Sequence, residues 1–565
     1  MPILRSFRFG FPCVAAATWL LSGPVAAADS SPGLSREQRV TQVFTRIVKA
    51  GEPGCATGVM RSGEPIYAAA FGKADIESGV AIDTETVMDI ASLSKQFTAF
   101  AVLLLEQRKL LSLDDPIVKY LPELAASARG VTLNQLLHHT GGLRDYTALL
   151  ELRGRRWGDG ATQYEALQAL ARQREPNSPP GTRYEYSNTG YFLLSQIVER
   201  VSGQPLVEFA RRHIFEPLKM THTRFVDRFP TGIPRLARGY SQAEGGGFEL
   251  DESGWEMTGD GRVTTTVGDL AKWDANFYDG RVGGLQLVAR MQVPGSLGSG
   301  ETLPYAMGLM IDEYRGQPVV YHSGWWVGFR SFLVRFPRER LSVSVLCNRS
   351  DAPTRDLANA VAEIWLEGEM KVPAEPYELR MLRAKGSSAR LEDVTPGLYH
   401  CPACGDFVRL AREDSTWNLV GVGGNIPLVS AAPGVYWAKG YGTVHLGVST
   451  SPARVVLQRG YESFEYEPVA DWSPKSLQSY VGAYWSEEGQ SRCNIVLRQG
   501  ALFLETCIDT IPLKPASRDE LASIEDRVSL RFTPSGAGRP REFRYYVAGL
   551  RGVRFERQVP GSRSP

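Results

Sequence analysis

Hydrophobic and polar positions in the first two thirds of the chain follow two different periods. Residues 56–71 alternate around a polar turn at 62–65, which predicts a β-hairpin. After Ser92 the apolar residues recur at helical spacing, so a helix is expected to begin near Ser92. Strand-like runs return at residues 318–322 and 331–347, and a turn at 337–340 splits the second run.

Two helix starts in this region carry capping signals. Thr132 with Gln135, and Thr266 with Asp269, have the spacing of a capping box ahead of apolar helical runs. Strands at both ends with helices between them predict an α+β domain over residues 29–371.

The pattern changes after residue 371. Residues 372–390 combine prolines, charges and small side chains, which favours a linker. From residue 391 short alternating runs separated by glycine turns dominate, which predicts small antiparallel β-barrels or sandwiches. A weak repeat, PGLY at 396–399 and VGAY at 481–484, divides this tail into two β-barrel domains, 391–471 and 472–565, with a junction near 471–474.

Composition and the N-terminus narrow the possible partners. Lys and Arg total 63 against 62 for Asp and Glu, so no nucleic-acid partner is expected. Arg5 and Arg8, the apolar stretch 11–21 and the alanines at 26–28 predict a signal peptide over residues 1–28. The mature chain is therefore expected in the periplasm or outside the cell, with no membrane span after signal removal.

Removal of the signal peptide leaves an even number of cysteines, which favours disulfides in an exported chain. They are Cys55, Cys347, Cys401, Cys404, Cys493 and Cys507. Cys401 and Cys404 have no second CxxC or ligand cluster nearby, which leaves a tight disulfide or free thiols rather than a zinc site. Cys493 and Cys507 flank a turn and predict a cross-strand disulfide.

The candidate chemistry begins at Ser92-Leu93-Ser94-Lys95. Residues three apart share one face of a helix, and an amine one turn away can activate a serine hydroxyl as a nucleophile. A capping serine on an exposed first turn would carry the same letters, so this string alone is weak.

Two further motifs follow in order, Tyr186-Ser187-Asn188 and the strand-borne His322-Ser323-Gly324. SxxK, YxN and [KHW]-x-G in this order resemble the penicillin-recognising serine hydrolases, within them the class C β-lactamase-like branch, over residues 40–367. The resemblance implies a β-lactamase/transpeptidase-like fold without a metal or an organic cofactor.

The resemblance also implies a role for each site residue. Ser92 is the acylating nucleophile, Lys95 activates it, and Tyr186 is the base for Ser92 and then the acid for the leaving group. A tyrosine titrates near 10, so the nearby ammonium is expected to lower its pKa. Asn188 would hold the substrate amide. The backbone N–H groups of Ser92 and Trp325 would form the oxyanion hole.

The third motif departs from the β-lactamases. They usually carry a lysine where this chain has His322, and a histidine is mostly neutral at pH 7. This argues against an efficient β-lactamase or a strict carboxypeptidase, and HxG with Gly324 is similar to D-stereospecific aminopeptidases and some esterases. Trp325 and Trp326 either narrow the cleft or pack. His138 and His139 are interpreted as loop and packing residues.

The tail adds a second resemblance. A class C-like domain followed by two small eight-stranded, lipocalin-like barrels is similar to D-aminopeptidase, in which a loop from the last barrel reaches the active site. The expected function is a D-aminopeptidase, amidase or esterase acting on small peptides, amides or esters. The alternatives are a β-lactamase or D,D-peptidase acting on peptidoglycan, and a noncatalytic envelope protein that binds peptidoglycan or a partner. A homodimer stays open.

Overall fold

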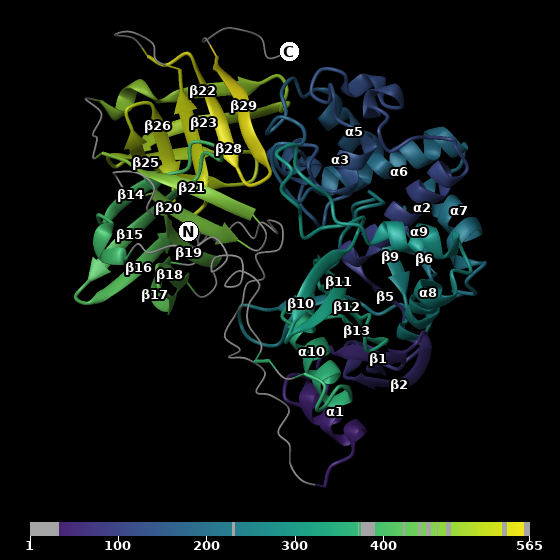
Figure 1. Ribbon diagram of the computed structural model, residues 1–565. Coiled ribbons are helices and arrows are strands. Elements are labelled where there is room, and N and C mark those ends of the chain that lie inside the picture. Colours follow the sequence, from purple (N-terminus) through teal and green to yellow (C-terminus); the bar gives the residue numbers. More distant parts are fainter. Residues whose placement is uncertain are drawn as a thin grey trace.

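The computed structural model divides into a helix-and-sheet part and two barrels that lie beside it (Figure 1). It describes residues 33–228, 232–370, 372–373, 390–421, 424–438, 442–447, 454–459, 462–470, 476–533 and 539–558. The predicted signal peptide, most of the predicted linker and the predicted junction at 471–474 lie outside these residues.

A six-stranded sheet of antiparallel neighbours forms the base of the first part. Its order is β10 (Met310–Tyr314), β11 (Gln317–Trp326), β12 (Phe329–Phe336), β13 (Leu341–Cys347), β1 (Cys55–Arg61) and β2 (Glu64–Phe71). The predicted hairpin and the predicted split of the 331–347 run are confirmed. β11 is longer than the sequence pattern indicates and continues through the whole HxG motif.

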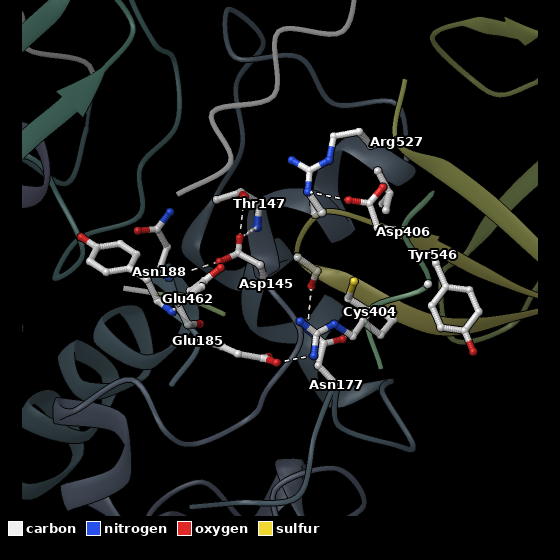
Figure 2. A pocket seen from close by; sticks show the side chains of 18 of the residues that line it. Asp145, Thr147, Asn177, Glu185, Asn188, Cys404, Asp406, Glu462, Arg527 and Tyr546 are labelled. Carbon is white, nitrogen blue, oxygen red and sulfur yellow. Dashed lines mark hydrogen bonds and ion pairs between the residues drawn. The ribbon is translucent and has the colours of Figure 1, made fainter. Parts of the chain in front are cut away.

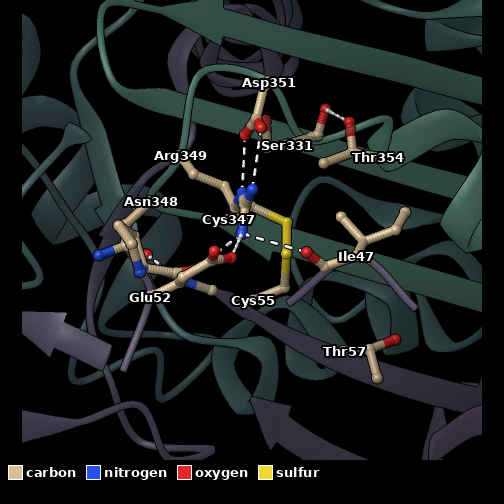
Figure 3. The surroundings of a disulfide bond; sticks show 12 residues. Ile47, Glu52, Cys55, Thr57, Ser331, Cys347, Asn348, Arg349, Asp351 and Thr354 are labelled. Carbon is tan, nitrogen blue, oxygen red and sulfur yellow. Dashed lines mark hydrogen bonds and ion pairs between the residues drawn. A yellow bond between two sulfur atoms is a disulfide. The ribbon is translucent and has the colours of Figure 1, made fainter. Parts of the chain in front are cut away.

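The first and last strands of this sheet along the chain, β1 and β13, are neighbours in it. Cys55 and Cys347 are register partners there and form a disulfide that joins positions 292 residues apart (Figure 3). Just after it, the Arg349 guanidinium donates to Asp351 at 2.6 and 2.8 Å and to Glu52 at 2.9 Å. A bond that closes so long a loop constrains the unfolded chain strongly.

Helices cover both faces of the sheet. α1 (Arg36–Thr45) and α10 (Thr354–Trp365) pack on the face that carries Tyr67, whereas α8 (Val267–Asp279) lies against Gly58 on the other face. The remaining helices are α2 (Lys95–Gln107), α3 (Leu133–Leu137), α4 (Tyr146–Leu152), α5 (Gln163–Ala171), α6 (Asn188–Ser202), α7 (Leu206–Ala210) and α9 (Gly284–Met291).

One predicted capping box is complete and the other is half formed. Thr132 and Gln135 exchange both bonds at the start of α3. Thr266 accepts the Asp269 N–H at the start of α8, but the Asp269 carboxylate accepts the Thr223 hydroxyl at 2.8 Å rather than returning to the cap. A buried threonine hydroxyl needs a partner, and it competes for this carboxylate.

The tail forms two closed eight-stranded barrels. The first contains β14 (Gly397–His400), β15 (Phe407–Glu413), β16 (Thr416–Gly421), β17 (Gly424–Ala432), β18 (Val435–Ala438), β19 (Gly442–Gly447), β20 (Arg454–Arg459) and β21 (Glu462–Pro468). The second contains β22 (Gly482–Ser486), β23 (Ser491–Arg498), β24 (Ala501–Glu505), β25 (Thr510–Ser517), β26 (Glu520–Ser523), β27 (Val528–Phe532), β28 (Glu542–Val547) and β29 (Leu550–Arg557).

The sequence repeat marks equivalent positions of the two barrels. Tyr399 and Tyr484 lie on the first strand of each, and both hydroxyls donate to the carbonyl oxygen four residues back, at 2.6 and 2.9 Å. The PGLY and VGAY strings therefore open two copies of one fold.

The two cysteine predictions in the tail have different outcomes. Cys401 and Cys404 form the tight disulfide. The predicted Cys493–Cys507 bond is wrong, because both thiols are free. The paired register ends at Asn494 and Glu505, and Cys507 lies beyond the end of β24, where its sulfur lies 3.8 Å from the Ser491 hydroxyl oxygen. Cys493 is buried and Cys507 is exposed.

None of the described helices combines the length and the apolar character that crossing a bilayer requires.

Candidate active site

Ser92 lies on a short 3-10 turn, Ala91–Ser94, that leads directly into α2. The turn is held from outside the helix, because the Asp89 carboxylate accepts the Ala91 N–H at 2.7 Å. Ser92 is half-buried, and Lys95 follows one turn later as the first residue of α2. The predicted helix start near Ser92 is confirmed, and its side chain shares a face with that of Lys95.

The Lys95 amine connects three parts of the site. Its Nζ lies 3.0 Å from Ser92 Oγ, 2.9 Å from Asn188 Oδ1 and 2.7 Å from the Asp260 carbonyl oxygen. The last two atoms only accept hydrogen bonds. When the Lys95 amine is neutral, its two N–H groups therefore donate to Asn188 and to the Asp260 carbonyl, and its lone pair is left to face Ser92.

Burial makes this amine easier to deprotonate. Desolvation lowers the pKa of Lys95 to about 8, although the negative charges of Asp260 and Asp145 oppose the shift. The amine is therefore partly neutral at neutral pH.

Tyr186 completes the predicted convergence on Ser92. Its ring centroid lies 5.0 Å from Lys95 Nζ, and the Ser92 side chain is close enough to influence the pKa of the phenol. The pKa that the sequence analysis expects for Tyr186 is wrong in direction. Desolvation raises the pKa of the phenol above its ordinary value, and the neighbouring Ser92 side chain opposes the rise without cancelling it. The Tyr186 phenol therefore keeps its proton at neutral pH.

His139 packs against the YxN segment. Its Nδ1 accepts the Ser187 N–H at 3.1 Å, and its ring lies 4.2 Å from the ring of Tyr186. Desolvation lowers the pKa of His139 well below the ordinary value, so the ring is neutral. His138 is also buried, with Nδ1 2.9 Å from the Asn134 carbonyl oxygen. Both contacts fit the predicted packing roles.

His322 is buried on β11 and stays neutral. Its Nδ1 lies 2.6 Å from the Ser323 carbonyl oxygen, which can only accept, so Nδ1 carries the proton. Its Nε2 then accepts from the Tyr305 hydroxyl at 3.1 Å. Desolvation first, and then the positive charge of Lys95, lower the pKa of His322 to about 3. This side chain supplies no positive charge for a substrate carboxylate.

Gly324 lets β11 lie against the turn that carries Ser92. A Cβ at this position would lie 2.1 Å from the Ile90 carbonyl oxygen, so any side chain would push the strand away. Ser331 on β12 donates to the same oxygen at 2.7 Å. Trp325 is half-buried, with the Arg330 guanidinium 4.6 Å from its ring centroid. The oxyanion role of the Ser92 and Trp325 amides stays a prediction.

Trp326 packs against two other tryptophans. Its ring centroid lies 4.4 Å from that of Trp157, edge to face, and 6.1 Å from that of Trp255 in a tilted arrangement. For Trp326, packing is therefore the alternative that these contacts favour.

A cavity of about 120 Å³ lies behind the YxN segment, between the catalytic domain and both barrels (Figure 2). Tyr186, Ser187 and Asn188 form part of its wall. Glu462 and Asp406 come from the first barrel's strands and loops, and Arg527, Gly549 and Arg551 from the second. Within the described ranges, no cluster of three or more His, Cys, Asp or Glu side chains is arranged to hold a metal ion.

Three acidic residues at the site escaped the sequence analysis. Asp145 accepts the Asn188 N–H at 3.1 Å, and the Asp260 carboxylate accepts the Tyr146 hydroxyl at 2.8 Å. Glu462 accepts the Tyr186 N–H at 3.1 Å across 276 residues. Asp145 also caps α4, a local signal that could have marked it, whereas nothing near Glu462 in the sequence refers to the active site.

A serine, a lysine one turn away, and the tyrosine and asparagine of a YxN segment meeting at one amine define an SxxK-type serine hydrolase site. The chain belongs to the beta-lactamase family, whose model matches residues 40–364.

Named relatives agree with this assignment. The chain is 29% identical over 339 residues to penicillin-binding protein 4* of Bacillus subtilis (strain 168), covering 56% of this chain and 73% of that protein. It is 28% identical over 355 residues to a D-aminopeptidase of Gluconobacter oxydans (strain 621H), covering 61% and 66% respectively. With this family and these relatives, the chain is a serine hydrolase.

Solved structures extend the likeness. The octameric penicillin-binding protein homologue of Pyrococcus abyssi has a TM-score of 0.53 and 26% identity, covering 74% of this chain and 96% of that one. A structure described as SurE covers 93% of this chain and 99% of its own, with a TM-score of 0.51 and 18% identity. At that identity it shows the fold alone, and its coverage extends the likeness into the barrels.

Proposed function

We propose that the chain is an exported hydrolase that forms an acyl-enzyme at Ser92 and cleaves small aminoacyl amides, peptides or esters, with D-aminopeptidase or amidase activity foremost. The observation that carries this proposal is the Lys95 amine, which contacts Ser92 Oγ, Asn188 and the Asp260 carbonyl at 2.7–3.0 Å. One basic atom thereby joins the nucleophile to the residue expected to hold the substrate amide.

Acylation begins with the neutral Lys95 amine. Ser92 Oγ attacks the substrate carbonyl carbon and its proton passes to Lys95 Nζ, because the pKa of about 8 makes this amine the better base. The Tyr186 phenol then donates its proton to the leaving nitrogen or oxygen as the bond to carbon breaks. The phenolate recovers a proton from the Lys95 ammonium, so the serine proton ends on the leaving group.

Deacylation repeats these transfers with water. Water adds to the ester carbonyl carbon as Lys95 Nζ accepts its proton, and the Lys95 ammonium then returns that proton to Ser92 Oγ as the bond from Oγ to carbon breaks. In this scheme Tyr186 acts as the proton donor to the leaving group and not as the first base, which differs from the role that the resemblance implies.

The neutral His322 ring supports an amide or ester substrate without a terminal carboxylate. A β-lactamase or D,D-peptidase must bind a carboxylate, and His322 with a pKa of about 3 offers no charge for it. Because the chain is similar to penicillin-binding protein 4*, a β-lactamase or D,D-peptidase is the second candidate, and the test below includes it. A purely binding role is disfavoured because all the reacting groups are present and aligned.

Export and self-association are further parts of the proposal. Residues 1–28 read as a signal peptide, and disulfides at Cys55–Cys347 and Cys401–Cys404 suit an oxidising compartment. The Pyrococcus homologue is described as octameric, so self-association is proposed without restriction to the homodimer.

The test is a panel of substrates with a covalent probe. D- and L-aminoacyl p-nitroanilides, short p-nitrophenyl esters and nitrocefin are each given to wild type and to Ser92→Ala, and both proteins are treated with a fluorophosphonate. Serine-dependent turnover of an aminoacyl amide or ester above that of nitrocefin is expected. Faster nitrocefin turnover would favour the β-lactamase alternative, and equally poor labelling of both proteins would reject the enzyme.

A further inference from the structure

The backbone that carries Tyr186 is anchored residue by residue. The Glu185 N–H donates to the His139 carbonyl oxygen at 2.9 Å, the Ser187 N–H donates to His139 Nδ1 at 3.1 Å, and Asn188 donates to Asp145 at 3.1 Å. All three acceptors belong to the catalytic domain.

Tyr186 itself is anchored differently. Its N–H donates to Glu462 Oε1 at 3.1 Å, and Glu462 is the first residue of β21 in the first barrel. Within this run of four amides, the one that belongs to the proton-transferring tyrosine is held by another domain. Figure 2 shows Glu462 beside Asn188 and Asp145 at the wall of the cavity.

Other barrel contacts converge on the same segment. Arg551 of the second barrel forms an ion pair with Glu185. Both side chains are largely buried, with 14% and 13% of their surface exposed. The Arg183 guanidinium lies 5.9 Å from the ring centroid of Phe464 on the first barrel. The chain just before Tyr186 therefore contacts both barrels.

We propose that Glu462 is a positioning residue for Tyr186, and that the first barrel is thereby part of the working active site. This rests on the proposed function. A carboxylate accepts an amide N–H more strongly than a neutral oxygen does. The bond fixes the Cα from which the phenol reaches Ser92. A displacement of about 1 Å in a catalytic group can cost on the order of a hundredfold in rate.

Two variants separate positioning from charge. Glu462→Gln keeps an oxygen acceptor at the same reach and removes the charge, whereas Glu462→Met keeps the size and removes both oxygens. Glu467→Ala is the matched control, because Glu467 is an exposed carboxylate on the same strand whose partner is Arg454, at 3.0 Å.

The full chain of each variant is assayed with a neutral p-nitrophenyl ester and a cationic aminoacyl p-nitroanilide, and labelled with a fluorophosphonate. Glu462→Met is expected to lower kcat for both substrates by about tenfold or more, with KM nearly unchanged. Glu462→Gln and Glu467→Ala are expected to stay near wild type. Thermal melts set an assay temperature at which every variant is folded.

Two outcomes would overturn the positioning role. Wild-type kcat in Glu462→Met is the first. The second is an equal rise of KM in Glu462→Gln and Glu462→Met for the cationic substrate alone. That result would assign Glu462 to binding a substrate ammonium. Failure of the proposed function is a different result, namely wild-type protein without turnover or labelling that depends on Ser92.

Discussion

The catalytic domain and the barrels carry their functional residues in different ways. Ser92 and Lys95 are three residues apart, and Tyr186 and Asn188 share one short segment, so local strings reveal them. Glu462 and Arg551 reach the same segment from strands whose own sequence has no catalytic pattern. Chemistry concentrates in local motifs because reacting atoms need short, fixed spacings, whereas support comes from any surface that the fold brings near.

The largest expected effect follows from removing the nucleophile of the catalytic domain. Ser92→Ala is expected to lower kcat by roughly 10³-fold to 10⁶-fold, since no other group supplies the attacking oxygen. Turnover of the best ester or anilide measures this, with an unchanged thermal melt as the control for folding. Residual activity within tenfold of wild type would mean that another residue attacks.

The next largest effect concerns the contact between domains. Arg144 of the catalytic domain and Glu488 of the second barrel form an ion pair at 2.8 Å. The pair is buried, with 1% and 7% of the two side chains exposed. Glu488→Ala leaves the Arg144 charge buried and is expected to cost about 3–5 kcal/mol of stability. Denaturant unfolding is the measurement.

The matched control spans the same two domains on the surface. Arg544 and Glu175 pair at 2.8 Å with 34% and 58% exposure, so Glu175→Ala is expected to cost less than about 1 kcal/mol. If both variants lose the same stability, the second barrel is not held by its buried contact.

The next prediction compares the Cys55–Cys347 disulfide of the catalytic sheet with the free thiols of the second barrel. Replacing Cys55 and Cys347 together by serine is expected to cost about 2–5 kcal/mol in the melt, because the bond closes 292 residues. Cys507→Ser should change little. Native thiol titration should find Cys507 reactive and Cys493 protected, and a Cys493–Cys507 bond in a peptide map would contradict the two free thiols.

The smallest expected effect is a shift along the pH axis. The amine of Lys95 acts in its neutral form and has a pKa of about 8, so kcat/KM for a neutral ester should rise with pH through that value. The Asp260 carboxylate raises this pKa, so Asp260→Asn should move the rise to lower pH. A rise that stays in place or moves upward would show that Lys95 is not the titrating base.

Much of the catalytic fold could be predicted from the sequence. The 56–71 hairpin, the helix after Ser92 and the Thr132 cap depend on neighbouring residues, and all three are present. The pairing of β1 with β13 depends on contacts almost 300 residues apart, and no local pattern indicates it.

The site was predictable in its members and less so in its charges. Ser92 and Lys95 follow from their spacing and Tyr186 from the resemblance of the three motifs to a known family, but the pKa of Tyr186 depends on how completely the folded domain removes water from it. The Cys493–Cys507 error has a similar origin, because two cysteines that flank a turn bond only if the folded chain brings their sulfur atoms together. Such quantities are properties of the assembled structure.

The account depends most on Ser92 as the atom that becomes acylated with Lys95 as its base. The most direct measurement is peptide mapping by mass spectrometry after timed fluorophosphonate labelling at several pH values. The adduct should lie on the peptide that contains Ser92, and its rate of formation should rise through about pH 8. An adduct on a different residue, or a labelling rate independent of pH from 6 to 9, would contradict the account.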